Sequence, residues 1–213
     1  MKTPATSVRW LPWTLALLGL AALCWALVLW GADWRAFIEA HPEAGAAVFC
    51  GLMIVLPLVG FPISAFYVFA GLTFSVPVAL AAGGVGLAAN MSLGYLLART
   101  VWREPLRRRL EPRWPRLFAL DRNACAQVTL LVRAVPGVPF TAQNYLLGVL
   151  AVPFGLYLAL SWAVQFVFLT GVVLTTRGVM DKDGAQALWG GLAVAVALIG
   201  TRLVWRRWKR NSI

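Results

Sequence analysis

The sequence predicts an all-α integral membrane protein in which a re-entrant helical hairpin and a transmembrane helix occur twice, as an inverted repeat, with further transmembrane helices at both ends. Its 213 residues are 61% hydrophobic and only 13% charged, which is more apolar than a soluble domain of this length requires. Two of its apolar segments, 58–72 and 129–149, are interrupted by glycine and proline. The basic residues gather beside the apolar segments, as they do at membrane surfaces.

The two interrupted segments predict broken helices at membrane depth. Pro136 and Pro139 each lack an N–H, and each biases the residue before it away from helical geometry. Backbone that is not helical is tolerated within a membrane only where protein buries it or where it lines a watery cavity. We therefore expect two re-entrant hairpins, at 44–74 and 124–150. Their predicted breaks lie at Gly60, Pro62, Pro136, Gly137 and Pro139.

The two hairpin segments repeat one pattern at a constant offset, which indicates an internal duplication. The aligned pairs are Gly60 with Gly137, Pro62 with Pro139, Ser64 with Thr141, Ala65 with Ala142, and Gly71 with Gly148. In both copies a long uncharged segment follows, which predicts crossing helices at 77–98 and 154–176. The two hairpins enter from opposite sides, so the repeat is inverted, as in secondary transporters whose site lies between two halves near the midplane.

The distribution of charged residues predicts where the remaining elements lie relative to the membrane. Residues 1–43 are expected to form an N-terminal transmembrane helix, at 10–32, and an acidic external loop. Residues 99–122 carry eight arginines and three acidic residues, so they form a cytoplasmic loop by the positive-inside rule. Residues 178–213 are expected to hold the last crossing and a basic tail. The result is a multi-pass protein of the cell (plasma) membrane with four crossings and with both termini in the cytoplasm.

The basic loop at 99–122 has a pattern of its own. Trp102, Leu106, Leu110 and Trp114 recur every fourth residue, with arginines between them. This spacing predicts a short helix that lies in the headgroup region. A solvated basic loop that only fixes the topology explains the same pattern, and both interpretations stay open.

Small residues also recur every fourth position in the first crossing, at Ala82, Gly86, Asn90 and Gly94. Such a stripe lets two membrane helices approach closely, and an asparagine in it can donate a hydrogen bond across the contact. Part of the stripe also matches a dinucleotide-binding fingerprint, but no strand precedes it, so we interpret it as packing. The residues expected in helix packing are Gly71, Gly86, Asn90, Gly94 and Gly148.

Composition disfavours several function classes. The net charge of +11 does not predict a nucleic-acid partner, because the basic residues flank apolar segments instead of sharing a soluble face. Cys24, Cys50 and Cys125 lie far apart and His41 is the only histidine, so we expect no metal and no cofactor. No carboxylate pair or Ser–His arrangement lies in the apolar segments, so we do not expect an enzyme.

The motif around Arg133 resembles that of the SNARE-associated Golgi protein family, the VTT-domain relatives of DedA. The resemblance rests on Arg133-x-x-Pro136-Gly137-x-Pro139-Phe140, on Asn144-Tyr145-x-x-Gly148, and on Phe61-Pro62 through Gly71. It covers roughly 44–177. It implies two opposed re-entrant hairpins and membership among proteins thought to move or scramble lipids, including carriers of polyprenyl phosphate. The acidic residues of DedA itself, which are proposed to couple transport to protons, have no counterpart in 44–98.

A charge in the middle of a membrane costs about 2.5–3.5 kcal/mol on insertion scales, so Arg133 should face protein, water or a bound anion. We expect a lipid transporter or scramblase in which this guanidinium binds the phosphate of an anionic headgroup, because it stays charged and can bind two oxygens at once. Membrane lipids would be its partners. The residues expected to bind the substrate are Arg133, Asn144, Tyr145, Thr141 and Ser64.

Three alternatives stay open. Arg133 is equally able to cap the free carbonyls of the opposite hairpin, which would make it structural. The protein as a whole could be a scaffold that organises membranes without transporting anything, through its basic loop. It could also transport a small solute or an ion, although the apolar segments lack the side chains that metal ions prefer.

Overall fold

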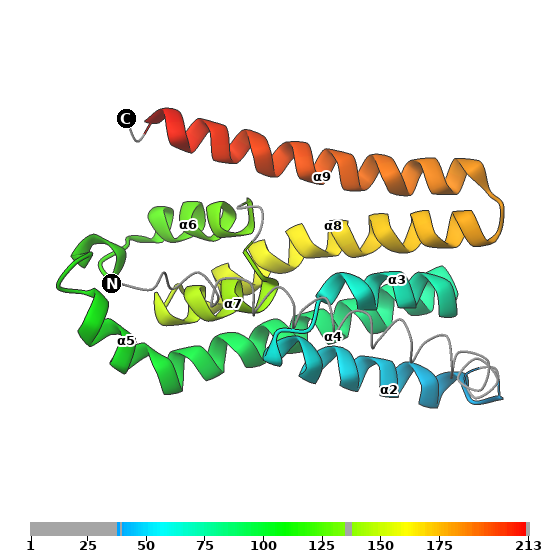
Figure 1. Ribbon diagram of the computed structural model, residues 1–213, viewed down its shortest axis with the longest axis horizontal. Helices are drawn as coiled ribbons and strands as arrows, with labels where there is room; N and C mark the ends of the chain where they lie inside the picture. Colours follow the sequence, from blue (N-terminus) through cyan, green and yellow to red (C-terminus); the bar gives the residue numbers. More distant parts are fainter. Residues whose placement is uncertain (1–37, 39, 135–137, 212–213) are drawn as a thin grey trace, which may run out of the picture. The chain divides into compact units, whose positions relative to one another are not determined.

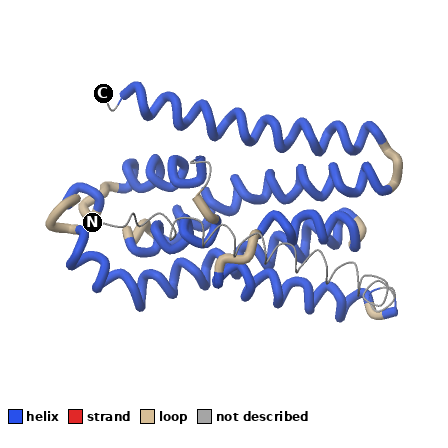
Figure 2. The backbone as a smooth tube through the Cα atoms, in the orientation of Figure 1, coloured by secondary structure: helices blue, strands red, loops and turns tan. Residues whose placement is uncertain are grey.

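The structure, a computed structural model, describes residues 38, 40–134 and 138–211, and every regular element in this part of the chain is a helix (Figure 2). The transmembrane helix predicted at 10–32 and the predicted breaks at Pro136 and Gly137 lie outside the described residues. By its internal contacts the chain divides into units 1–45 and 46–213. The first unit contains the start of the first described helix, where the Gly45 N–H donates to the His41 carbonyl. The contacts between the other elements lie within the second unit.

The first helix–break–helix unit consists of α2 (Pro42–Val55), the short 3-10 helix η1 (Leu56–Val59) and α3 (Ile63–Thr73). Gly60 ends η1 with a φ of 98°, a left-handed conformation that glycine adopts without strain. Pro62 then stands at the N-cap of α3. Phe49 of α2 packs against both Phe66 and Phe74, whose ring centroids lie 5.8 and 5.4 Å away, so α3 runs back along α2. The first predicted break is therefore a break in the structure.

The next helix is longer than the sequence predicts. α4 (Val76–Leu97) continues through the π-helical segment η2 (Ala98–Trp102) into α5 (Arg103–Leu110). Within the predicted cytoplasmic loop, residues 99–110 are therefore helical, as the spacing of Trp102, Leu106 and Leu110 predicts, and only 111–121 connect, with the short 3-10 helix η3 (Pro115–Leu117) among them. The physical reason is local, because ion pairs four residues apart support α5.

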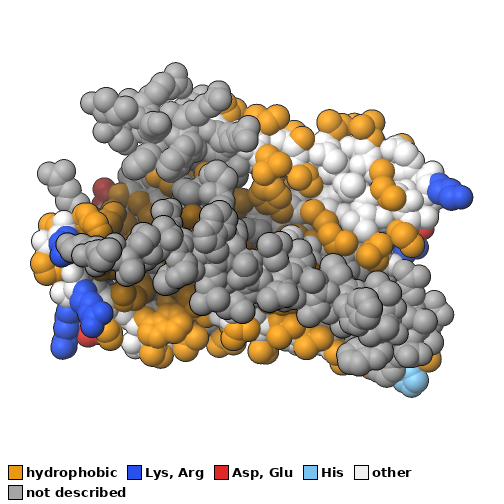
Figure 3. Space-filling view, viewed as in Figure 1, with side chains coloured by type: hydrophobic (Ala, Val, Ile, Leu, Met, Phe, Trp, Pro, Cys, Tyr) orange, Lys and Arg blue, Asp and Glu red, His pale blue; other side chains and the backbone are white. Residues whose placement is uncertain are grey.

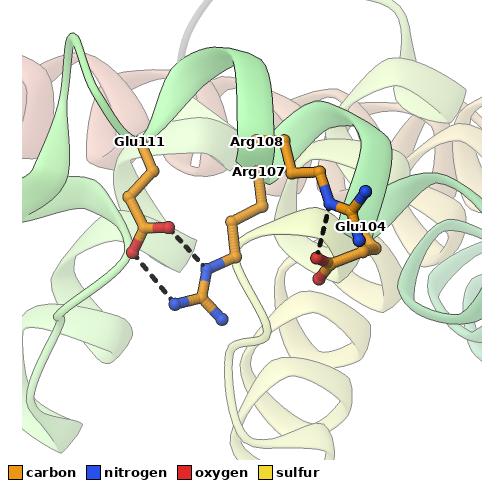
Figure 4. Close-up of polar contacts among 4 residues, drawn as sticks. All are labelled: Glu104, Arg107, Arg108 and Glu111. Carbon is orange, nitrogen blue, oxygen red and sulfur yellow. Dashed lines mark hydrogen bonds and ion pairs between the residues drawn. The ribbon is translucent and has the colours of Figure 1, made fainter.

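Figure 4 shows these pairs, which join residues of α5 with one another and with Glu111 just after it. Arg107 Nε lies 2.8 Å from Glu111 Oε2, and Arg108 Nε lies 3.0 Å from Glu104 Oε1. The hydrogen bond from Arg107 lowers the pKa of Glu111 below its usual value. Both pairs are solvent-exposed, so each contributes little alone, but together they favour a helix where the arginines would otherwise repel one another.

The second helix–break–helix unit consists of α6 (Arg122–Ala134) and α7 (Phe140–Val149), and α8 (Phe154–Met180) and α9 (Gly184–Asn211) follow it. α8 contacts α3, α4, α6 and α9, so it is the helix around which the others are placed (Figure 1). The observed bounds of α4 and α8 lie close to the expected crossings, 77–98 and 154–176. α9 extends through the predicted basic tail, whose side chains are not described.

The small residues singled out in the sequence lie at close helix contacts. A Cβ built on Gly71 would lie 2.9 Å from Thr176 of α8, and one on Gly86 would lie 3.2 Å from the Met53 sulfur of α2. A Cβ on Gly94 would approach Leu58 and Asn144, at 3.3 and 3.5 Å. These positions let α4 and α8 pack closely against the broken helices, as small residues do in membrane proteins.

The length of two helices and the apolar surface are typical of a membrane protein. Two helical segments, 76–110 and 154–180, are long and apolar enough to cross a bilayer, and 43–59, 63–73 and 184–200 are shorter apolar helices. Val85, Trp189 and Val196 point outward and are 63%, 68% and 66% exposed. Figure 3 shows hydrophobic side chains over much of the described surface, with Lys and Arg side chains near the ends of the helices. Water is a poor solvent for such a surface, whereas lipid is a good one.

Candidate functional site

Arg133 lies in the last turn of α6 and is buried, with 6% of its surface exposed. Its guanidinium is held by three neutral side chains. Nε donates to Ser161 Oγ at 3.1 Å, Nη1 donates to Gln143 Oε1 at 3.0 Å, and Nη2 donates to Asn144 Oδ1 at 2.6 Å. We call Arg133, Gln143, Asn144 and Ser161 the arginine cluster. It joins α6, α7 and α8 at one point.

A further set of contacts holds the arginine cluster in place. The Tyr157 hydroxyl lies 3.1 Å from Asn144 Oδ1 and 3.0 Å from the Met91 carbonyl of α4. The Arg133 guanidinium also lies over two aromatic rings, 5.4 Å from the centroid of Phe140 and 5.8 Å from that of Tyr157. Aromatic faces attract a cation electrostatically, and more strongly where water is excluded. The guanidinium is therefore oriented from several sides.

The charge of Arg133 has no carboxylate partner within the described part of the chain. The ion pairs found there belong to Arg107, Arg108 and Arg177. A guanidinium has five N–H donors, and the arginine cluster uses three of them. Amide and hydroxyl oxygens satisfy donors but do not neutralise a charge. The site is thus a buried positive centre with donors left over, which is suited to an anion.

The free carbonyls of the first break are capped by other residues. The Thr141 hydroxyl donates to the Pro57 carbonyl, and the Tyr145 hydroxyl donates to the Leu58 carbonyl at 2.6 Å. Asn90 Nδ2 donates to the Ile54 carbonyl at 2.7 Å. Arg133 bonds side chains of α7 and α8 and none of these carbonyls, so in this structure it does not cap the opposite hairpin. Thr141 and Tyr145 lie one turn apart on the face of α7 toward η1, whereas Arg133 bonds Gln143 and Asn144 of α7 and Ser161 of α8.

The residues predicted to bind substrate thus fall in three places. Arg133 and Asn144 belong to the arginine cluster, while Thr141 and Tyr145 bond the backbone of η1. Ser64 is exposed on α3 and is not among the side chains that bond Arg133. Their role in substrate binding stays a prediction.

Sequence reasoning missed Gln143, Tyr157 and Ser161. A usable pattern was present, because Tyr157, Ser161 and Gln165 recur every fourth residue and form a polar stripe on the otherwise apolar α8. Gln165 also has a partner across the fold, since its Oε1 accepts a hydrogen bond from the Tyr67 hydroxyl at 3.2 Å. Within the described residues, no group of His, Cys, Asp and Glu could hold a metal ion.

A comparison with models of protein families identifies the VTT domain over residues 61–177, more than half of the chain. The chain belongs to the VTT-domain family. This confirms the resemblance drawn from the motif around Arg133, and the VTT domain contains the whole arginine cluster and η2. The VTT family, which includes the SNARE-associated and DedA proteins, consists in general of non-enzymatic membrane proteins. Comparisons with curated proteins and with solved structures give no match.

Proposed function

We propose that this VTT-domain protein transports or scrambles membrane lipids and that Arg133 attracts their anionic headgroup. The observation that carries the proposal is the buried guanidinium, held by neutral side chains and without a carboxylate partner in the described chain. In this proposal the two helix–break–helix units are re-entrant hairpins of an inverted repeat, with the site between them. A headgroup would pass where broken backbone and buried polar groups lower the free-energy cost of placing it in the membrane interior.

One feature supports an anion in particular, and a second supports a polar headgroup in general. The donors that the arginine cluster leaves over belong to a planar group that binds two phosphate oxygens side by side. In addition, Asn90 has a buried Oδ1 without a hydrogen-bond partner in the described part of the chain. Such an acceptor beside the first break could receive a hydrogen bond from a headgroup hydroxyl or from water.

Reconstitution tests this function. The purified protein is placed in phosphatidylcholine vesicles that carry a trace of fluorescent phosphatidylglycerol or fluorescent phosphatidylcholine, and a membrane-impermeant quencher is added outside. We expect the protected fluorescence to fall below that of protein-free vesicles, and to fall faster for the anionic lipid. If folded protein moved neither lipid, the transport function would be rejected and a scaffold role would be favoured.

The topology is part of the same proposal, with both termini and the 99–122 region in the cytoplasm and the turn between α8 and α9 outside. We expect Arg109→Cys to react with a membrane-impermeant thiol reagent only after cells are opened, and Lys182→Cys to react on intact cells, in a chain whose own cysteines are replaced by alanine. The expectation follows from the arginines in 99–122. Both positions are exposed, so access to solvent does not limit the labelling. Reaction of Arg109→Cys on intact cells would reverse the proposed orientation.

A further inference from the structure

A second polar site lies away from the arginine cluster, at the junction of α5, the start of α6 and the turn between α7 and α8. A cavity of about 560 Å³ lies there, with Arg103 and Arg122 as its charged residues. Apolar residues, among them Phe118, Leu150 and Leu156, form most of its remaining wall. We call it the basic pocket. None of the residues that bond Arg133 lines it.

Arg103, in the wall of the basic pocket, has a buried hydrogen-bond donor without an acceptor among the described residues. Its Nε is buried and has no hydrogen-bond partner in the described part of the chain. Its neighbours on α5 differ, since Arg107 and Arg108 each bond a glutamate (Figure 4). Glu111 already gives both of its oxygens to Arg107. A buried donor of a charged group is costly to leave unbonded, so Arg103 is prepared for an acceptor that the described chain does not supply.

The start of α8 adds partial positive charge to the wall of the basic pocket. α8 begins beside the basic pocket, where Gly155 and Leu156 line it, and the first hydrogen bond within the helix is that of the Tyr157 N–H to the Pro153 carbonyl. The N–H groups of Gly155 and Leu156 therefore precede the helical bonding pattern, at the positive end of the helix dipole. A Cβ built on Gly155 would meet nothing within 4 Å, so open space adjoins the backbone at this point.

No acidic residue is among the described residues that line the basic pocket. The acidic residues next to its arginines in the chain, Glu104 and Asp121, have other partners: Glu104 pairs with Arg108, and the Asp121 carboxylate accepts a hydrogen bond from the Ala124 N–H at 2.7 Å and so caps α6. From the cavity, the unbonded Arg103 and the start of α8 together, we infer that the basic pocket binds a phosphate ester. The phosphate lies between Arg103, Arg122 and the first amides of α8, and the apolar wall covers the carbon atoms that the ester carries.

The test compares the two sources of such an ester. The full-length protein is prepared in nanodiscs of phosphatidylcholine containing phosphatidic acid, where native mass spectrometry counts retained phosphatidic acid, and in detergent with glycerol 3-phosphate or inorganic phosphate, where calorimetry measures binding. Arg103→Gln is expected to weaken binding by about 10- to 100-fold, the loss typical of one charge-assisted hydrogen bond. Gly155→Phe keeps every charge and adds a large side chain at a residue that lines the cavity, so it is expected to block binding as well.

Arg109→Gln is the matched control, because it makes the same change of charge on the same helix at an exposed residue outside the basic pocket. Retained phosphatidic acid that depends on Arg103 and Gly155 but not on Arg109 identifies a lipid site. Binding of glycerol 3-phosphate or inorganic phosphate with the same dependence identifies a site for free phosphate. Equal loss in Arg103→Gln and Arg109→Gln, or full binding in Gly155→Phe, would overturn the inference.

Discussion

Replacing Arg133 by glutamine is expected to slow the movement of anionic lipid by about 10- to 100-fold in a protein that still folds. Glutamine carries no charge, but its amide can still donate to Gln143 Oε1 or Asn144 Oδ1, the oxygens that accept from Arg133 now. Asn144 Oδ1 also keeps the Tyr157 hydroxyl as a neighbour. The substitution therefore removes the positive centre and spares much of the polar network. Lipid transport and melting temperature are measured on the same purified variant.

The other substitutions of Arg133 separate charge from geometry. Arg133→Lys keeps the charge but loses the planar fork, so partial transport is expected. Arg133→Ala removes a donor from three acceptors, of which Asn144 Oδ1 keeps the Tyr157 hydroxyl. Each acceptor left unsatisfied costs about 1–3 kcal/mol where water cannot reach it, so stability and transport should fall together. Arg109→Gln makes the same charge change on the surface and should transport at the parental rate. Transport at the parental rate by folded Arg133→Gln would remove the main reason for proposing an anionic lipid.

The first helix break could be predicted from the sequence, because glycine and proline determine the backbone conformation at their own positions whatever their tertiary contacts are. Gly60 takes the positive φ that ends η1, and Pro62 begins α3, as their chemistry requires. The packing residues were readable for a similar reason, since a small side chain every fourth position indicates a helix contact whatever the partner is. The residues that these small residues contact could not be predicted, because the contact of Gly86 with Met53 depends on how the helices are arranged.

Less of the arginine cluster could be predicted from the sequence. Arg133 stood out because a charge in an apolar segment is expensive, but its acceptors are neutral and cost less to bury, so Ser161 and Gln143 gave a weaker pattern. The same limit affected the α4–α5 junction. An arginine-rich stretch indicates the side of a membrane, yet its helical state depends on pairs such as Arg107 with Glu111.

The second large effect, on stability, is expected when a methyl group is added at Gly148. Gly148→Ala should lower the free energy of unfolding by about 3 kcal/mol, at the upper end of overpacking costs. A Cβ on Gly148 would lie 2.5 Å from the Tyr95 carbonyl oxygen and 2.9 Å from the Ala98 Cβ, and backbone cannot move aside as a flexible side chain can. In an exposed helix the same exchange stabilises by about 0.5–1 kcal/mol, so the sign of the effect is itself informative. Thermal unfolding in detergent, followed by tryptophan fluorescence, measures it.

Gly51→Ala is the control for this prediction, because Gly51 lies within α2, is exposed and would meet nothing within 4 Å, so its melting temperature should stay or rise. Gly148→Ala should also impair transport. Gly148 lies one turn after Asn144, and pushing α7 away from α4 would draw Asn144 away from Arg133 and the Tyr145 hydroxyl from the Leu58 carbonyl. If Gly148→Ala melted at the parental temperature and moved lipid at the parental rate, α7 would not be held against α4, and the arginine cluster could not depend on that contact for its geometry.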